Sequence, residues 1–210
     1  MLSRNLAAAM AVGAGLSTSL IAQSAPDVIE AAFFFNGTER SFEQRPDVDA
    51  AQVAAHYRPS ANCGELRRAL HCAAHGGRRR TNGGERKVVS FVAEQVANGP
   101  GLLIDSRNAA DSTSGFITAS VNVPGKLLLP ENPFLNDIMQ AMGARSFEGS
   151  LNFADTLPLM IFDDGPSTTD TPNLINSLLA LGYPAEKISY YRGGMLVWTA
   201  LGLNTEDAKS

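Results

Sequence analysis

Cysteine is scarce in this chain of 210 residues, which contains only Cys63 and Cys72. The segment that carries them, CGELRRALHC, is typical of a helix, and nine residues of helix span about 13.5 Å. A disulfide needs Cα atoms within about 7 Å of each other. The sequence therefore leaves two alternatives: the helix breaks and the two thiols form a disulfide, or they do not pair with each other.

Histidine is rare as well, with three residues in the sequence. His71 and His75 lie close to the two cysteines, which raises the alternative of a metal site. The spacing of these residues matches no standard zinc pattern, so we predict no metal ion and no cofactor. The third histidine, His56, has no evident partner and is expected at the surface.

The chain also lacks a strong excess of charge of either sign. Its 17 Lys and Arg residues nearly balance 21 Asp and Glu residues, for a formal net charge of −4. No nucleic-acid-binding surface is predicted from this balance. The one basic cluster is Arg78-Arg79-Arg80, which lies in a Gly-rich and charged segment. That segment, residues 75–85, is more typical of a solvated linker than of a phosphate-binding patch.

Long apolar runs are missing after the first 24 residues. Arg4 precedes a run of small and apolar residues from Leu6 to Ile21, and Ala22-Gln23-Ser24 offers small residues where a signal peptidase cleaves. The alternative is a membrane anchor, but the run is short and diluted by Gly, Ser and Thr. We predict a signal peptide over residues 1–24, no membrane span after its cleavage, and a bacterial periplasmic or secreted location.

A small N-terminal extension is predicted over residues 25–74, before the linker. Asn36-Gly37 lies between two apolar runs, which is the signal of a β-hairpin. The stretches DVDAAQVAAH and ELRRALHCAA resemble short helices.

The remainder, residues 86–205, alternates between helical and strand patterns. Four short apolar segments are predicted as strands, namely residues 101–105, 120–124, 158–162 and 187–191. The intervening segments repeat apolar residues at helical spacing; they cover residues 87–98, 132–143, 171–182 and 195–202. Strands separated by helices predict an α/β fold, with a parallel sheet that has helices on both faces.

Several of these segments together resemble the rhodanese-like domain. They are GLLIDSR, SVNVPG, PLMIF with the loop and helix after it, and ALGYPAEKISYYRGGMLVWTALGL, in which Trp198 follows Gly193 by five residues. The resemblance spans Lys87 to Asn204. It is strongest to exported bacterial rhodanese-domain proteins whose loop carries a C-x-G-P-x-C arrangement.

The resemblance also implies where the active site would lie. In that family the residue directly after the central strand is a cysteine that accepts a sulfane sulfur, and backbone N–H groups of the loop surround the persulfide. Here that position is Asp163, and the second loop cysteine falls on Thr168. Gly165 and Pro166 are retained. The family's His-x-Pro-Gly-Ala segment is altered to Phe116-Ile117-Thr118-Ala119-Ser120.

The substitution of Asp163 for cysteine predicts that sulfur transfer at this loop is lost. A persulfide mechanism needs a polarisable sulfur that is both a good nucleophile and a good leaving group, and a carboxylate is neither. The acidic residues Asp163, Asp164 and Asp170 would also repel anionic thiosulfate. No catalytic residue is therefore predicted in the loop.

The loop remains the best candidate for binding. Because loop N–H groups need acceptors, we predict that a side-chain oxygen of Asp163, Thr168 or Asp170 accepts them, which would favour a charged carboxylate. Arg107 and Arg192 follow strand ends and would hold an anion, neutralise the aspartates or form salt bridges. The full set of predicted binding residues is Asp163, Asp164, Gly165, Pro166, Ser167, Thr168, Thr169, Asp170, Thr171, Arg107 and Arg192.

Other chemistries of the loop are weaker alternatives. An aspartate-nucleophile phosphatase needs an Asp-x-Asp spacing that Asp163-Asp164 lacks. Three aspartates with Thr hydroxyls would suit calcium, but no calcium-loop spacing is present. Asp, Gly, Pro, Ser and Thr are also the residues that turns and helix caps use, and this structural interpretation is favoured.

Two functions follow from these observations. The first is an exported rhodanese-like protein that has lost thiosulfate sulfurtransferase activity and acts as a binding or accessory module, for a protein or small-molecule partner that the sequence does not identify. The second is a sulfur-transfer or thiol-redox enzyme that uses Cys63 and Cys72 instead of the loop.

Overall fold

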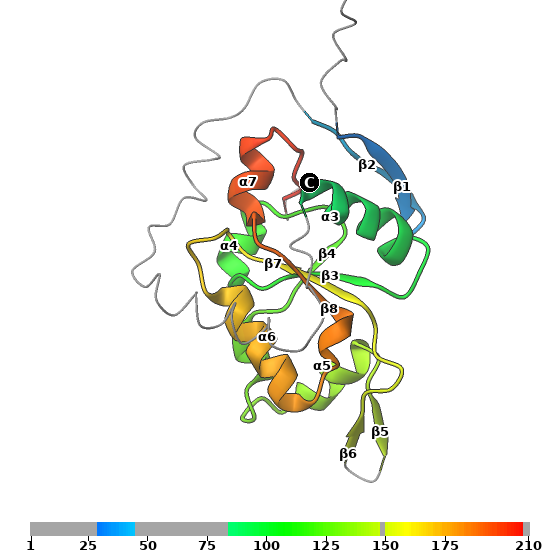
Figure 1. Ribbon diagram of the computed structural model, residues 1–210, viewed down its shortest axis with the longest axis vertical. Coiled ribbons are helices and arrows are strands. Elements are labelled where there is room, and N and C mark those ends of the chain that lie inside the picture. Colours follow the sequence, from blue (N-terminus) through cyan, green and yellow to red (C-terminus); the bar gives the residue numbers. More distant parts are fainter. Residues whose placement is uncertain (1–28, 45–83, 148–149, 208–210) are drawn as a thin grey trace, which may run out of the picture.

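The computed structural model describes residues 29–44, 84–147 and 150–207. Its centre is a sheet of four parallel strands in the order β4-β3-β7-β8. The α/β fold with a parallel sheet is thus confirmed (Figure 1). The strands are β3 (Leu102–Asp105), β4 (Ser120–Asn122), β7 (Leu159–Phe162) and β8 (Ile188–Tyr191).

Helices cover both faces of this sheet, as predicted. Successive strand residues point to opposite faces, so Leu103 packs into one hydrophobic cluster and Ile104 into another. The first cluster includes residues of α3 (Glu85–Phe91), of the π-helical turn η1 (Val92–Val96) and of α7 (Gly194–Ala200). The second includes residues of the 3₁₀ turn η2 (Gly125–Leu128), of α5 (Leu135–Ala141) and of α6 (Asp170–Leu181).

The predicted hairpin around Asn36-Gly37 is confirmed. It pairs β1 (Ala31–Phe35) with β2 (Thr38–Phe42), and both turn residues have positive φ, +49° and +76°. This conformation is the primed turn that matches the twist of paired strands, and Asn-Gly favours it.

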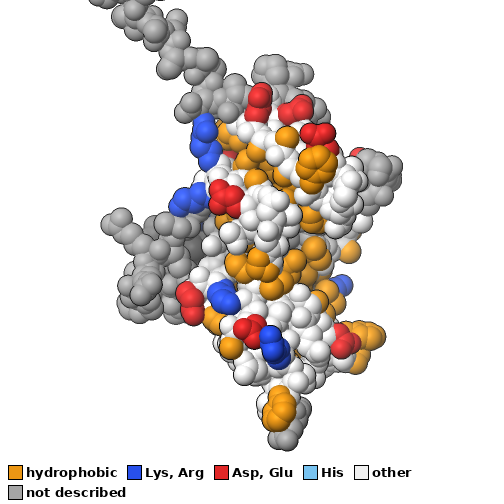
Figure 2. Space-filling view, turned by 90° about the vertical axis from the view of Figure 1, so that its right-hand side faces the viewer, with side chains coloured by type: hydrophobic (Ala, Val, Ile, Leu, Met, Phe, Trp, Pro, Cys, Tyr) orange, Lys and Arg blue, Asp and Glu red, His pale blue; other side chains and the backbone are white. Residues whose placement is uncertain are grey.

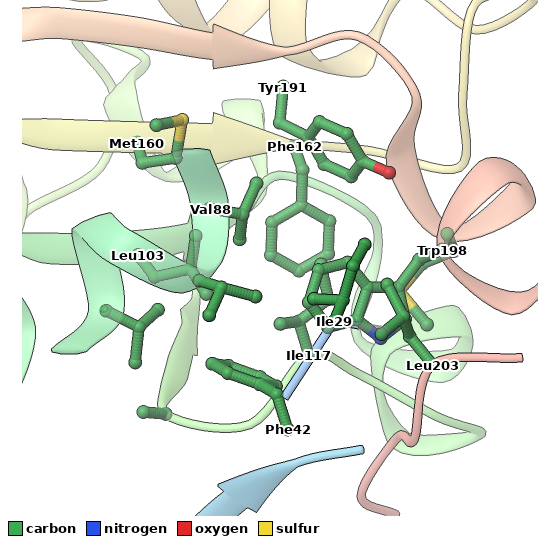
Figure 3. Packing of buried hydrophobic residues seen from close by; sticks show 14 of the residues in the cluster. Ile29, Phe42, Val88, Leu103, Ile117, Met160, Phe162, Tyr191, Trp198 and Leu203 are labelled. Atoms are coloured by element: carbon green, nitrogen blue, oxygen red, sulfur yellow. The ribbon is translucent and has the colours of Figure 1, made fainter. Parts of the chain in front are cut away.

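The hairpin packs against the sheet domain. Phe33 and Phe42 lie in the same cluster as Trp198 of α7, and Figure 3 shows Phe42 and Trp198 within it. Arg40 also forms an ion pair with Glu206. Trp198 is fully buried, and its indole N–H donates to the Asn204 carbonyl at 2.8 Å.

Helix α6 differs from its prediction at the N-terminus. In the sequence, Thr171-Pro172 is typical of an N-cap followed by the first helical residue. The helix instead begins at Asp170, with Thr169 as N-cap. Pro172 still lies within the first turn, where a missing N–H costs nothing. Gly182, with φ of +99°, ends the helix as predicted.

Besides η2, four other short elements were not predicted. The first two, β5 (Arg145–Phe147) and β6 (Ser150–Asn152), form a mainly exposed hairpin that projects at the lower end of Figure 1. The others are α4 (Ala109–Thr113), whose N-cap Asn108 accepts the Asp111 N–H at 3.0 Å, and a 3₁₀ turn, η3 (Ala185–Lys187).

Several predictions concern residues outside the described part. These are the signal peptide, most of the N-terminal extension and the linker, the paired or metal-bound states of Cys63 and Cys72, and the three histidines. Within the described residues, no helix has the length and apolar character needed to cross a membrane. On the face in Figure 2, described basic and acidic side chains are interspersed.

Candidate functional site

The candidate loop, residues 163–169, connects β7 to α6. It starts where β7 ends, next to the end of β3. After β3 the chain forms β4 on one side of β3. It later forms β7 and β8 on the opposite side of β3, so the strand order reverses at β3. Ligands of open α/β sheets bind at such a reversal of strand order, outside the carboxyl ends of the strands. The loop therefore lies where this fold places a binding site.

The Asp163 side chain fills the space between the loop and the start of α6. It is fully buried. Its Oδ1 accepts the Gly165 N–H at 3.0 Å, and its Oδ2 accepts the Thr171 N–H at 3.1 Å. The prediction that a loop side-chain oxygen accepts backbone N–H groups is confirmed. Since Thr171 lies in the first turn of α6, Asp163 also acts as a cap for this helix.

The charge of Asp163 is nevertheless disfavoured. Burial raises the pKa of Asp163 from its ordinary value of 3.8 to about 6. The Thr171 N–H, the Thr168 hydroxyl and the Gly165 N–H all lower this pKa, and nearby Asp170 raises it further. The N–H bonds thus favour the charged carboxylate, as expected, but desolvation outweighs them, so the net shift of the pKa is upward.

The rest of the loop is closed by local hydrogen bonds. The N–H and the hydroxyl of Thr168 both donate to the Gly165 carbonyl, at 3.1 and 2.9 Å. Ser106, just after β3, donates to the Phe162 carbonyl at 2.9 Å and contacts the Thr171 hydroxyl at 2.8 Å. These bonds connect the loop to the ends of both central strands.

Arg107 and two aspartates close the crevice between the strand ends. Arg107 is fully buried; its Nη2 contacts Asp105 Oδ2 at 2.7 Å and its Nη1 contacts Asp164 Oδ1 at 3.2 Å. It also donates to the Gly115 carbonyl at 2.6 Å. Burial by itself lowers the pKa of Arg107, but the hydrogen bond and charge of Asp105, followed by Asp164, raise it above its usual value. The salt bridge predicted for Arg107 is confirmed.

The Arg-Gly-Gly turn before α7 supports the loop from the other side. The N–H groups of Met195 and Leu196 donate to the Asp163 and Asp164 carbonyls, at 2.9 and 2.8 Å. This contact requires glycine at position 194, because a Cβ there would lie 2.4 Å from the Asp163 carbonyl oxygen. The backbone of the loop is thus held between α6 and α7.

We expect Gly194→Ala to lower the free energy of unfolding by about 2 kcal/mol. Its φ of +57° is costly for a residue with a Cβ, and the added methyl group also overlaps the loop backbone. Gly125→Ala is the matched control, since nothing lies within 4 Å of its added Cβ. Urea unfolding of both variants measures the difference, and equal losses would contradict this account.

Arg192 does not join the network. It is partly buried, and its Nε is buried without a hydrogen-bond partner among the described residues. The salt bridge that we considered for it is not found within the described part of the chain. Its charge acts on Tyr190, whose hydroxyl is also buried. Burial raises the pKa of Tyr190, and the charge of Asp163 raises it further.

Only part of the predicted binding set is accessible. Asp163, Asp164, Gly165, Thr168, Thr171 and Arg107 are buried. The partly exposed residues are Pro166, Ser167, Thr169, Asp170 and Arg192. Within the loop, the partly exposed residues thus lie in its second half, while the buried residues determine its shape.

The alternative chemistries gain no support from this geometry. A phosphatase-type nucleophile must reach its substrate, and the Asp163 carboxylate is fully buried. Among the described residues, no three or more His, Cys, Asp or Glu side chains form a group that could hold a metal ion. Sequence reasoning gave no role to Asp105 and Ser106, although both stand in the GLLIDSR segment at the end of β3.

Among known proteins, several solved structures are similar to this chain. No protein-family model matches the sequence, and no curated protein matches it. The rhodanese-like domain of the Alr3790 protein from Anabaena sp. is 21% identical, with a TM-score of 0.38 over 58% of this chain and 75% of that one.

Two other structures are similar over much of their length. A protein from Bacillus halodurans is 14% identical, with a TM-score of 0.42 over 58% of this chain and 73% of that one. A protein of unknown function from Rhodopseudomonas palustris, described as a possible tyrosine phosphatase, is 14% identical, with a TM-score of 0.45 over 71% of this chain and all of that one. At these values the likeness says nothing about individual residues of the loop.

Proposed function

We propose that this chain is an exported rhodanese-like domain that has lost thiosulfate sulfurtransferase activity and acts as a binding or accessory module. The observation that carries the proposal is the Asp163 carboxylate. It stands at the position of the family's cysteine, is fully buried, and accepts the Gly165 and Thr171 N–H groups itself.

These bonds matter because the same donors would have to serve a substrate. A helix N-terminus attracts anions through its free N–H groups and its dipole. In this chain a carboxyl group of the protein itself already occupies that environment. A thiosulfate ion would have to displace Asp163 and then lie next to the negative charge of Asp170.

The chemistry of the carboxylate leads to the same conclusion. Sulfur transfer requires a thiolate that attacks the sulfane sulfur and later leaves from the persulfide. Within the described residues no cysteine is present. The partly exposed second half of the loop, Pro166 to Asp170, is then the surface that meets a partner.

A thiosulfate:cyanide assay on the purified full chain tests this proposal. We expect thiocyanate formation at the level of a buffer blank, for the wild type and for a Cys63→Ser/Cys72→Ser variant. Turnover that Asp163→Ala abolishes would overturn the proposal. Turnover that only the double cysteine variant abolishes would move the chemistry to Cys63 and Cys72.

Asp163→Cys provides a stricter test. It returns a thiol to the family's position, but we expect less than about a tenfold gain over the blank, because burial keeps a thiol protonated and Asp170 still repels anions. Ser167→Cys is the matched control, since it places a partly exposed thiol elsewhere in the same loop. Brisk turnover by Asp163→Cys alone would show that the loop retains the rest of the catalytic site.

A further inference from the structure

The Asp163 carboxylate closes the loop because it accepts hydrogen bonds from backbone N–H groups near both ends of the loop. One carboxylate oxygen accepts an N–H from Gly165, near the start of the loop, and the other accepts an N–H from Thr171, in the first turn of α6. Both partners are neutral. No Lys or Arg of the described residues forms an ion pair with Asp163, so its negative charge is buried with hydrogen bonds alone.

The groups around Asp163 do not compensate its charge. From α6, Asp170 contributes a second negative charge, and from the loop Thr168 contributes a neutral hydroxyl. From the β3 side, Arg107 is bonded to Asp105 and Asp164.

Arg192 is not among the groups that shift the pKa of Asp163. From β8 and the turn after it, Tyr190 presents a neutral hydroxyl, and the charge of Arg192 acts on Tyr190. The start of α7 contributes only backbone N–H groups, which bond to the Asp163 and Asp164 carbonyls.

We infer that closure of this loop is coupled to the uptake of one proton by Asp163, so that the loop opens more readily as the pH rises through the neutral range. The proton comes from solvent and neutralises the carboxylate. One oxygen of the neutral acid still accepts an N–H bond, and its O–H can turn toward the hydroxyl of Thr168 or Tyr190. The inference rests on the proposed non-catalytic, self-closed loop.

The direction of the pH dependence follows from linkage. The pKa of Asp163 is about 6 when the loop is closed, against 3.8 for an ordinary aspartate. The closed form therefore holds more protons than the open form between these values. Its extra stability is complete below about pH 4 and is lost as the pH rises through about 6.

Hydrogen exchange of the Gly165 and Thr171 amides measures this coupling directly. After correction for intrinsic exchange, we expect the opening equilibrium to increase about tenfold between about pH 5 and about pH 7.5. Asp163→Asn should remove the increase. Asp155→Asn, which removes an exposed carboxylate paired with Arg145, should retain it.

A carbon-13 titration of the Asp163 carboxyl in the wild type needs no substitution. A midpoint near pH 6 supports the inference, and a midpoint near the ordinary value of aspartate would overturn it. An equal pH dependence of exchange in Asp163→Asn would overturn it too. Neither result depends on sulfur transfer, which the thiocyanate assay measures separately.

Discussion

Replacing Arg107 with methionine should lower the free energy of unfolding by about 3–5 kcal/mol at neutral pH. The substitution removes the cation from two buried carboxylates, Asp105 and Asp164, which then lose their charge partner. It also leaves the Gly115 carbonyl without its donor. Urea unfolding followed by the fluorescence of the single tryptophan, Trp198, measures the loss.

The matched control is Arg145→Met. Arg145 forms an ion pair with Asp155 at 2.9 Å, but the two side chains are 75% and 59% exposed. Surface pairs of this kind contribute less than about 1 kcal/mol. If Arg107→Met were as mild as Arg145→Met, the buried network would not be what holds the two strand ends together.

The sheet and its helices were predictable because their signals are local. Four short apolar segments became the four strands, and apolar spacing marked α3, α5, α6 and α7. The β5–β6 hairpin had no such signal. The side chains of Arg145, Ser146 and Phe147 are all exposed, so no apolar alternation marks this segment.

The candidate site was predictable only in part. The sequence placed Asp163, Asp164 and Arg107 after strand ends, and hence near one edge of the sheet. It did not determine that Arg107 bonds to Asp105 and Asp164 while Asp163 turns toward α6. That choice depends on the adjacency of β3 and β7, which brings Asp105 opposite Phe162. Arg192, at the end of the edge strand β8, has no acidic residue paired with it in the described part of the chain.

The relation of the N-terminal hairpin to the domain was also not apparent from the sequence. The hairpin was expected to belong to a separate extension, yet its described residues share the core of the sheet domain. Asn204 donates its side-chain amide to the Ser41 carbonyl and accepts the Glu43 N–H, at 2.9 and 3.0 Å. A turn signal predicts that a hairpin forms, whereas its packing partner depends on side chains distant in the sequence.

Phe42→Ala should therefore destabilise the whole domain, by about 3–5 kcal/mol. The Phe42 ring is fully buried, 5.1 Å from Phe33 and 5.3 Å from Trp198 between ring centroids. Its removal leaves a cavity and deletes an edge-to-face aromatic contact. Phe34→Ala is the matched control, because Phe34 lies on the partner strand of the same hairpin and is 66% exposed. It should cost less than about 0.5 kcal/mol.

The two variants separate the alternatives for residues 29–44. If the hairpin were an appendage, removing Phe42 would loosen it without changing the urea midpoint that Trp198 fluorescence reports. If it forms part of the core, the midpoint falls and the α7 end of the cluster opens in the same transition. Since α7 holds the loop backbone through Met195 and Leu196, Phe42→Ala should also increase exchange of the Gly165 amide, whereas Phe34→Ala should not. Unchanged exchange in Phe42→Ala, together with a lowered midpoint, would show that the hairpin stabilises the domain without supporting the loop.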